Sequence, residues 1–138
     1  MTAKSLKAKL LAMVLAVTVM TVLMANVYVK AVTDPKDGYT GDAHIYGRST
    51  ISWGMASGST SATYYDGDVI ALASGTYVYV NTTTGVYYHV PGYNQGTSSA
   101  VISFQAPDGC QSYTMSCYHW AQKGSNTPWS NSTYVLYS

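Results

Sequence analysis

The sequence predicts an all-β protein: a single small antiparallel β-sandwich, or a small barrel, of about seven or eight short strands after an N-terminal hydrophobic segment. Thr, Tyr and Val, which favour half-buried strands, recur in short runs between turn residues. After the hydrophobic segment, no run of ten or more residues combines helical periodicity with good helix formers. The length of 138 residues suits one compact domain rather than two.

Eight runs are expected to form strands, namely 43–53, 60–65, 68–73, 76–80, 86–90, 98–104, 111–121 and 132–137. Turn residues separate them, among them Ser74-Gly75 between the third run and the fourth. Asn81 to Gly85 predict a hairpin turn, with Gly85 in the left-handed region. Residues 91–97 and 122–131 are expected to be loops.

The first 31 residues predict a secretory signal peptide that is cleaved after Ala31. Lys4, Lys7 and Lys9 precede an uncharged apolar run from Leu10 to Val29. This run of 20 residues is also long enough to cross a bilayer, so an uncleaved membrane anchor or a pilin-like helix is the alternative. Residues 32–42 are expected to be a flexible lead-in, and residues 43–138 the β-sandwich domain. Both interpretations place the domain outside the cell or on its surface.

The composition excludes a nucleic-acid-binding protein and disfavours the cytosol. Charged residues make up only 9% of the chain and the formal net charge is +1, so the electrostatic footprint for nucleic acid is missing. Ser, Thr, Gly and Tyr supply about half of residues 32–138. The abundant Tyr side chains can supply apolar area in a core poor in aliphatic residues, or can form a binding surface. The sequence leaves both interpretations open.

The two cysteines, Cys110 and Cys117, predict an intramolecular disulfide in an exported protein. Seven residues along one straight strand span roughly 23 Å, whereas a disulfide needs Cα atoms within about 7 Å. The prediction therefore requires the chain to reverse near Tyr113-Thr114. The spacing does not fit a structural zinc site.

The sequence indicates no catalytic residues, no metal site and no cofactor. The chain has no Glu, and no serine stands in a G-x-S-x-G elbow. Cys117 and His119 would share one face of a strand, but the expected disulfide would consume the thiol. An enzyme would need a convergent pocket around one of the three histidines, which are His44, His89 and His119.

Tyr93, Trp120 and Trp129 are the predicted ligand-binding residues. They stand near Asn94, Gln95, Asn126 and Asn131 in the sequence. Planar rings beside amide groups suit carbohydrate or peptide recognition, because the rings stack and the amides fix orientation. On this interpretation, Trp129→Ala should abolish binding and spare the fold.

These observations favour a secreted, non-enzymatic binding or effector module that acts at cell envelopes or on glycans. The alternative is a structural subunit of an extracellular filament or surface coat, assembled through the N-terminal segment and through strand pairing. A cleaved monomer would favour the module. A large assembly that retains residues 10–29 would favour the filament, and only an uncleaved segment would hold the chain at a membrane.

Some residues resemble a known group of secreted proteins. These are Tyr87-Tyr88-His89, Ser99-Ala100-Val101, Trp120-Ala121 and, near the end, Asn131, Thr133 and Tyr137. They resemble the lactococcin type of bacteriocin, over about half of the expected domain. The Gly-Gly-Thr-Trp start of that family is not found here, and this chain is longer. The resemblance implies, as a second alternative, a bacteriocin-like secreted protein with a β-sandwich fold.

Overall fold

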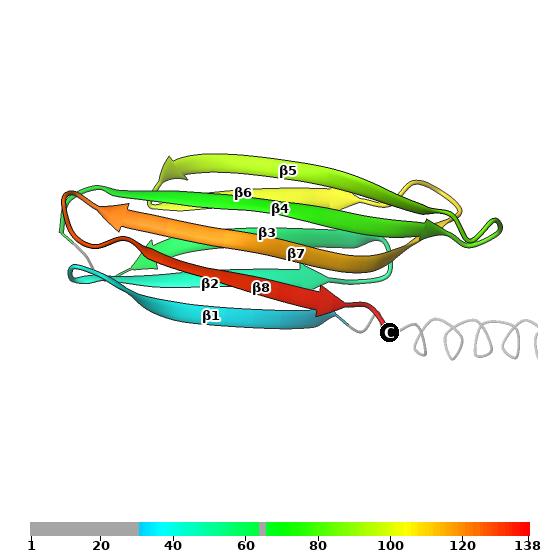
Figure 1. Ribbon diagram of the computed structural model, residues 1–138, viewed down its shortest axis with the longest axis horizontal. Coiled ribbons are helices and arrows are strands. Elements are labelled where there is room, and N and C mark those ends of the chain that lie inside the picture. The colour runs from blue at the N-terminus through cyan, green and yellow to red at the C-terminus, as the bar shows by residue number, and fades with distance from the viewer. Residues whose placement is uncertain (1–30, 64–65) are drawn as a thin grey trace, which may run out of the picture.

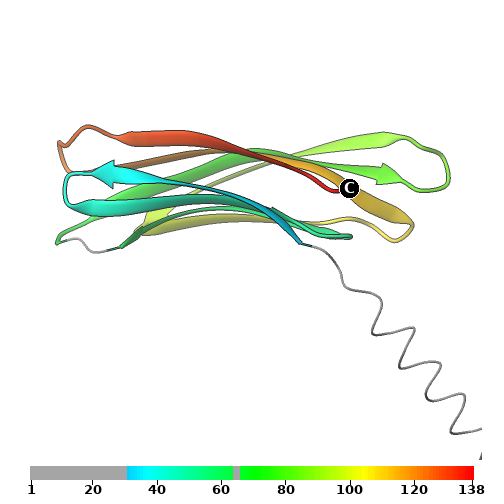
Figure 2. The same ribbon diagram turned by 90° about the horizontal axis from the view of Figure 1, so that it is seen from below.

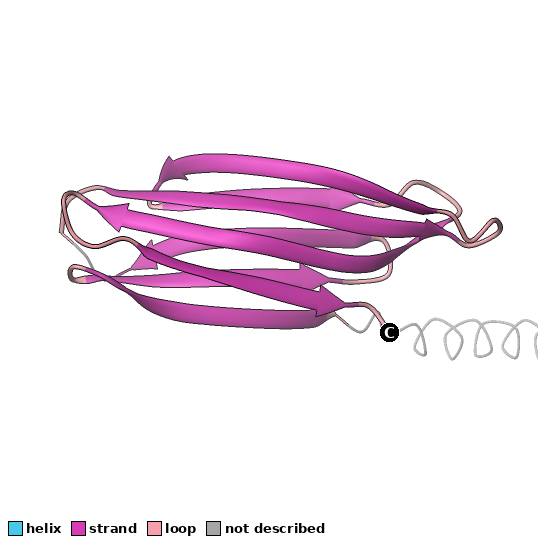
Figure 3. Cartoon of the chain, viewed as in Figure 1, coloured by secondary structure: helices cyan, strands magenta, loops and turns pink. Residues whose placement is uncertain are grey.

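The computed structural model describes residues 31–63 and 66–138, and this part of the chain is all-β (Figures 1 and 3). Two four-stranded antiparallel sheets lie face to face in a sandwich-like arrangement. The strands are β1 (Val32–Thr40), β2 (Ala43–Ile51), β3 (Met55–Thr63), β4 (Val69–Asn81), β5 (Tyr87–Thr97), β6 (Ser99–Gln105), β7 (Cys110–Lys123) and β8 (Trp129–Leu136). The segment expected to be a signal peptide or anchor, residues 1–31, lies outside the described residues except for Ala31.

The two sheets have simple orders. Sheet A runs β1-β2-β3-β6, and sheet B runs β5-β4-β7-β8. Strands β1 and β8 therefore form one open edge of the sandwich and β6 and β5 the other, as Figure 1 shows; Figure 2 is seen from the side of β1 and β8. Across the described ranges, no helix is long and apolar enough to span a membrane.

The core consists mainly of small side chains because alternate residues of each strand point inward. Strand β2 shows this pattern clearly, with buried and more exposed residues alternating from Ala43 to Ile51. The buried apolar residues are Ala43, Ile45, Ile51, Ala56, Val69, Ala71, Ala73, Tyr77, Val78, Ala100, Ile102, Met115, Cys117, Ala121 and Val135. Tyr77 is the fully buried tyrosine among the described residues, and most of the others lie at the surface.

Glycines on one sheet make room for large side chains of the other. A Cβ atom on Gly47 of β2 would lie 2.6 Å from His119 Cγ of β7. A Cβ atom on Gly92 of β5 would lie 2.5 Å from Phe104 Cζ of β6. The indole of Trp129 in β8 occupies the same kind of space over Gly38 of β1. These glycine pockets let bulky groups enter an otherwise narrow interior.

The expected lead-in, residues 32–42, is instead largely a strand. Val32–Thr40 form β1, which pairs with β2 along its whole length from Val32↔Ile51 to Thr40↔Ala43. The charged and turn-forming residues of this segment concealed the alternation expected of a strand. Pro35 is tolerated there because β1 is an edge strand.

The turn expected at Ser74-Gly75 is absent. Strand β4 runs unbroken from Val69 to Asn81 and joins the third and fourth expected strands. A Cβ atom on Gly75 would lie in the backbone of β7, so this glycine serves close strand packing rather than a turn.

The loop expected at 91–97 is also a strand, the second half of β5. Its turn-forming residues, Pro91, Gly92 and Asn94, misled the prediction because edge strands tolerate such residues. Of the loop expected at 122–131, only residues 124–128 lie between β7 and β8.

The predicted hairpin turn is confirmed. Asn81 Oδ1 accepts hydrogen bonds from the backbone amides of Thr83 and Thr84, at 3.0 and 2.9 Å. Gly85 has φ of 70°, the left-handed conformation expected of it. The side chain of Asn81 therefore fixes the turn that connects β4 with β5.

The predicted disulfide is wrong, because Cys110 and Cys117 are both free. The reversal that the bond requires does not occur, and β7 continues from Cys110 to Lys123. The pairing of β7 with β4 shows a β-bulge instead: Thr114 faces Val78 and Ser112 faces Tyr79, so Tyr113 is the extra residue. Along a continuous strand, the two cysteines lie too far apart to bond.

Candidate binding groove

The outer face of sheet B carries the main candidate site. Register places Gln95 of β5, Leu72 of β4 and Trp120 of β7 in one row across this face. The next row holds Tyr93, Ser74 and Tyr118, continued by Ser132 of β8. Because side chains alternate along a strand, these residues all point away from the core.

Two adjoining hollows on this face form what we call the sheet B groove. The first has a volume of about 660 Å³ and is lined by Ser74, Gly75, Thr76, Pro91, Gly92, Tyr93, Ser116, Cys117, Tyr118, Ser132 and Thr133. The second has a volume of about 550 Å³ and is lined by Asp68, Ile70, Leu72, Gln95, Tyr118, Trp120, Gln122 and Gly124. Tyr118 lines both hollows, so the groove is continuous across the sheet.

The groove combines aromatic walls with a hydroxyl floor. Tyr93 is 64% exposed and Tyr118 is 45% exposed, so both rings are available for stacking. Tyr93 Oη donates a hydrogen bond of 2.9 Å to Gln95 Oε1, which fixes the direction of the ring. Ser74 lies between these two rings, and Thr76 and Ser116 lie in the next row along the sheet. The arrangement can stack an apolar ring face and bond to hydroxyl groups.

The groove is almost free of charge. Of the residues that line the two hollows, one is charged: Asp68, in the second hollow. The lining therefore suits a neutral, hydroxyl-rich ligand better than an ionic one, because it offers an ionic ligand little charge complementarity.

The structure brings two of the three predicted binding residues together. Tyr93 and Trp120 both line the groove. Tyr118, which the sequence analysis did not single out, joins them. The signal for it was present, since Tyr118 and Trp120 are two residues apart in a predicted strand and so share a face.

Trp129 lies apart from these residues, on the inner face of the edge strand β8. It is half-buried, packs over Gly38, and contacts the small apolar cluster of Ala43, Ile45, Val69 and Ala121. Its position makes Trp129 a packing residue between the two sheets. The amides near it in the sequence do not bring it to the groove.

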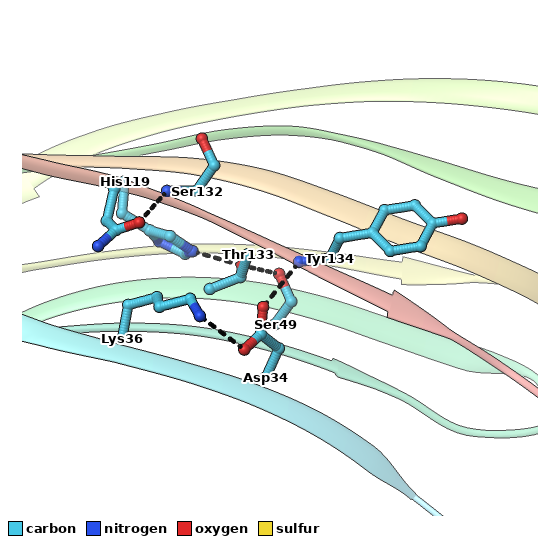
Figure 4. A network of polar contacts seen from close by, with 8 residues as sticks. Asp34, Lys36, Ser49, His119, Ser132, Thr133 and Tyr134 are labelled. Atoms are coloured by element: carbon cyan, nitrogen blue, oxygen red, sulfur yellow. Dashed lines mark hydrogen bonds and ion pairs between the residues drawn. The ribbon is translucent and has the colours of Figure 1, made fainter.

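A polar network lies beneath this face, at the centre of the sandwich (Figure 4). His119 is fully buried, and its Nε2 lies 2.7 Å from Thr133 Oγ1. Thr133 Oγ1 in turn lies 2.5 Å from Ser49 Oγ of sheet A. On the other side of the ring, His119 Nδ1 lies 2.9 Å from Thr60 Oγ1, also of sheet A. The network ties the two sheets together through hydroxyl groups.

The direction of each bond follows from one fixed donor. Thr60 Oγ1 donates its hydrogen to the carbonyl oxygen of Leu72 at 2.7 Å, so it accepts from His119 Nδ1. A neutral imidazole then has Nε2 as an acceptor, and Thr133 donates to it. Ser49 in turn donates to Thr133. Burial lowers the pKa of His119 to about 4, which agrees with this neutral ring.

Cys117 lies beside His119, with Sγ 3.8 Å from Nδ1, as its position two residues away on one face predicts. Burial raises the pKa of the Cys117 thiol to about 11, so the nucleophilic thiolate is scarce at neutral pH. In the part of the chain that the structure describes, no group of three His, Cys, Asp or Glu side chains could hold a metal ion. Neither His44 nor His89 lines the groove.

The candidate residues thus fall into two sets: an aromatic groove on the surface and a neutral polar network in the interior. The groove is open to a ligand, whereas the network holds the sheets together. Comparison of the chain with protein-family models, with curated proteins and with solved structures found no match.

Proposed function

We propose that the protein is a secreted, non-enzymatic binding module that recognises neutral glycans, such as those of cell envelopes, in the sheet B groove. The observation that carries the proposal is the convergence of Tyr93, Tyr118 and Trp120 along one uncharged, hydroxyl-floored groove. Pyranose rings have apolar faces that stack on aromatic rings, and their hydroxyls pair with Ser, Thr and Gln side chains.

The size of the groove also supports a glycan. Each hollow falls within the range of small-molecule sites, and together they extend across strands β5, β4 and β7. A ligand longer than one sugar unit would occupy both hollows and contact Tyr118 at their junction. The rigid sheet beneath holds the rings in place before binding, which reduces the entropy lost on association.

Trp120→Ala and Trp129→Ala test the site as a matched pair. Trp120→Ala removes a wall of the groove and should weaken binding at least about fivefold, because a stacked ring contributes about 1 kcal/mol or more. Trp129→Ala should leave the affinity within about threefold but lower the free energy of unfolding by about 2 kcal/mol, because it empties the space over Gly38. The measurement is tryptophan fluorescence and calorimetric titration with neutral cello-, chito- and maltohexaose.

The proposal would be contradicted if the intact domain bound none of these neutral oligosaccharides. An unchanged affinity in Trp120→Ala for any of them that binds would contradict it as well. Urea unfolding of both variants separates lost binding from lost folding.

A structural subunit of an extracellular filament or coat is a second candidate, because one edge strand is suited to pairing. Strand β5 is an edge of sheet B, is 11 residues long and contains no Lys, Arg, Asp or Glu. Long uncharged edges are templates for strand addition between subunits, although Pro91 interrupts the row of backbone donors. The bacteriocin-like alternative rests on the resemblance alone.

A further inference from the structure

Arg48 stands out on the opposite face of the molecule, the outer face of sheet A. It is the single arginine of the chain. The other two side-chain cations among the described residues are both paired: Lys36 lies 3.5 Å from Asp34, and Lys123 bonds to Asp42. Within the same residues, the exposed guanidinium of Arg48 has neither a hydrogen bond nor an ion pair.

The absence of an internal partner is notable, since the described part of the chain is acidic, with six Asp against three basic residues. Asp37 lies on the neighbouring strand and lines a hollow together with Arg48. However, Asp37 Oδ2 lies 2.9 Å from His44 Nε2, and the ring of His44 is stacked on Tyr39. His44 thus occupies this carboxylate and leaves the arginine available.

On its other side, Arg48 lines a second, adjoining hollow of about 340 Å³, whose lining residues are Tyr46, Arg48, Ser59 and Ser61. Register places Ser59 directly across from Arg48 and Ser61 directly across from Tyr46, on strand β3. Within the described residues, neither serine hydroxyl has a hydrogen-bond partner. The hollow therefore combines a planar cation, two free hydroxyls and an aromatic ring on four neighbouring side chains of two paired strands.

We propose that this hollow, the Arg48 site, binds the carboxylate-bearing unit of an acidic saccharide. The guanidinium fork matches a carboxylate in a bidentate pair. Ser59 and Ser61 then bond to ring hydroxyls, and the 38% exposed ring of Tyr46 covers the apolar side of the sugar. The hollow lies at the small end of ligand-site volumes and so fits a single sugar unit. This site is independent of the sheet B groove, which lies on the other sheet and lacks a cation.

The lone arginine provides its own reporter. A ¹⁵N-labelled domain has one arginine Nε–H resonance, which belongs to Arg48 without further assignment. We expect trigalacturonate to shift this resonance in a saturable way, while neutral trigalactose leaves it in place at matched ionic strength. Inorganic phosphate is the third probe, because an oxyanion from a phosphate source would use the same cation.

A shift that phosphate or acetate reproduces at equal concentration would mean an adventitious ion only and would overturn the proposal. The absence of any saturable shift with trigalacturonate would overturn it as well. Binding that persists in the groove variant Trp120→Ala is expected, and its loss there would place the acidic sugar in the groove instead.

Variants test the geometry on the same probe. Arg48→Lys keeps the charge and loses the fork, so affinity for trigalacturonate should fall about tenfold. The double change of Ser59 and Ser61 to Ala should reduce it about fivefold, since two hydroxyl partners are lost. The matched control changes Ser57 and Ser103 to Ala, on the same face but outside the hollow, and should leave the affinity unchanged. Full affinity in Arg48→Lys, or equal losses in both serine pairs, would contradict the assigned contacts.

Discussion

His119 carries out a structural task that depends on its being neutral. Its ring donates to Thr60 and accepts from Thr133, and it thereby joins strand β7 to β3 of sheet A and to β8 of its own sheet. A second proton on the ring would turn Nε2 into a donor that faces the donating hydroxyl of Thr133, and it would place a charge in a fully buried position. Protonation and the native packing therefore oppose each other.

This opposition predicts that stability falls in mild acid. The pKa of His119 is lowered by burial from 6.5 to about 4, so the unfolded chain takes up the proton first. The free energy of unfolding should be level above pH 6.5 and should fall by about 3 kcal/mol between pH 6.5 and 4. Below that range this group should cause no further loss. Urea unfolding at a series of pH values measures the change.

His119→Gln should be less stable at neutral pH but should lose this part of the acid dependence. The matched control is His89→Gln, which removes an exposed histidine of the edge strand β5. A wild-type slope that survives in His119→Gln would assign the acid sensitivity to other groups, such as the carboxylates.

At the scale of elements, the sheets are joined by glycine pockets as much as by apolar area. Gly47 of β2 receives the His119 ring, and the space is too small for one added carbon. We expect Gly47→Ala to reduce the free energy of unfolding by about 2 to 3 kcal/mol, because either the ring or the strand must shift. Gly54, which has no atom within 4 Å of an added Cβ, is the control.

Gly54→Ala should change the free energy of unfolding by less than about 0.5 kcal/mol in the same urea titration. Equal stability of the two variants would show that the structure around Gly47 adjusts to an added methyl group. The glycine pocket would then not constrain the packing of the sheets.

The sequence predicted the class of fold and much of its strand order along the chain, since the alternation from Ala43 to Ile51 and the Asn81–Gly85 turn are local signals. The sequence-based prediction failed where the structural role of a residue depends on the strand beside it. Gly75 looked like a turn but is where β7 approaches closely. The charged β1 strand and the proline-containing half of β5 are edges, and a single sequence does not show which strands will be edges.

The candidate site was predicted in the same partial way. Tyr93 and Trp120 come together because alternation and register place them on one outer face. Trp129 resembles them in its sequence surroundings, but the facing Gly38 draws it inward. The disulfide failed for a similar reason, because nothing local distinguishes a reversal at Tyr113 from a bulge there.

For the whole molecule, the state of assembly separates the two candidate functions. The binding module predicts a monomer that lacks residues 1–31 and whose intact mass shows two unpaired thiols, since Cys110 and Cys117 are free. Intact mass spectrometry and light scattering of the native exported material measure both properties. A large assembly that retains residues 10–29 would instead favour the filament and would make the exposed aromatic side chains contacts between subunits.

The glycine pockets also bear on how such a chain can change over time. In three pairs, a glycine on one sheet leaves the space that a large side chain of the other sheet fills. These pairs are Gly38 and Trp129, Gly47 and His119, and Gly92 and Phe104. A mutation in one member alone leaves a clash or a void, so the two are expected to be replaced together. The Ser and Thr residues of the outer faces that line neither the groove nor the Arg48 site carry no such constraint. Descendants of this chain should therefore keep the spacing of these pairs after most of those Ser and Thr residues have diverged.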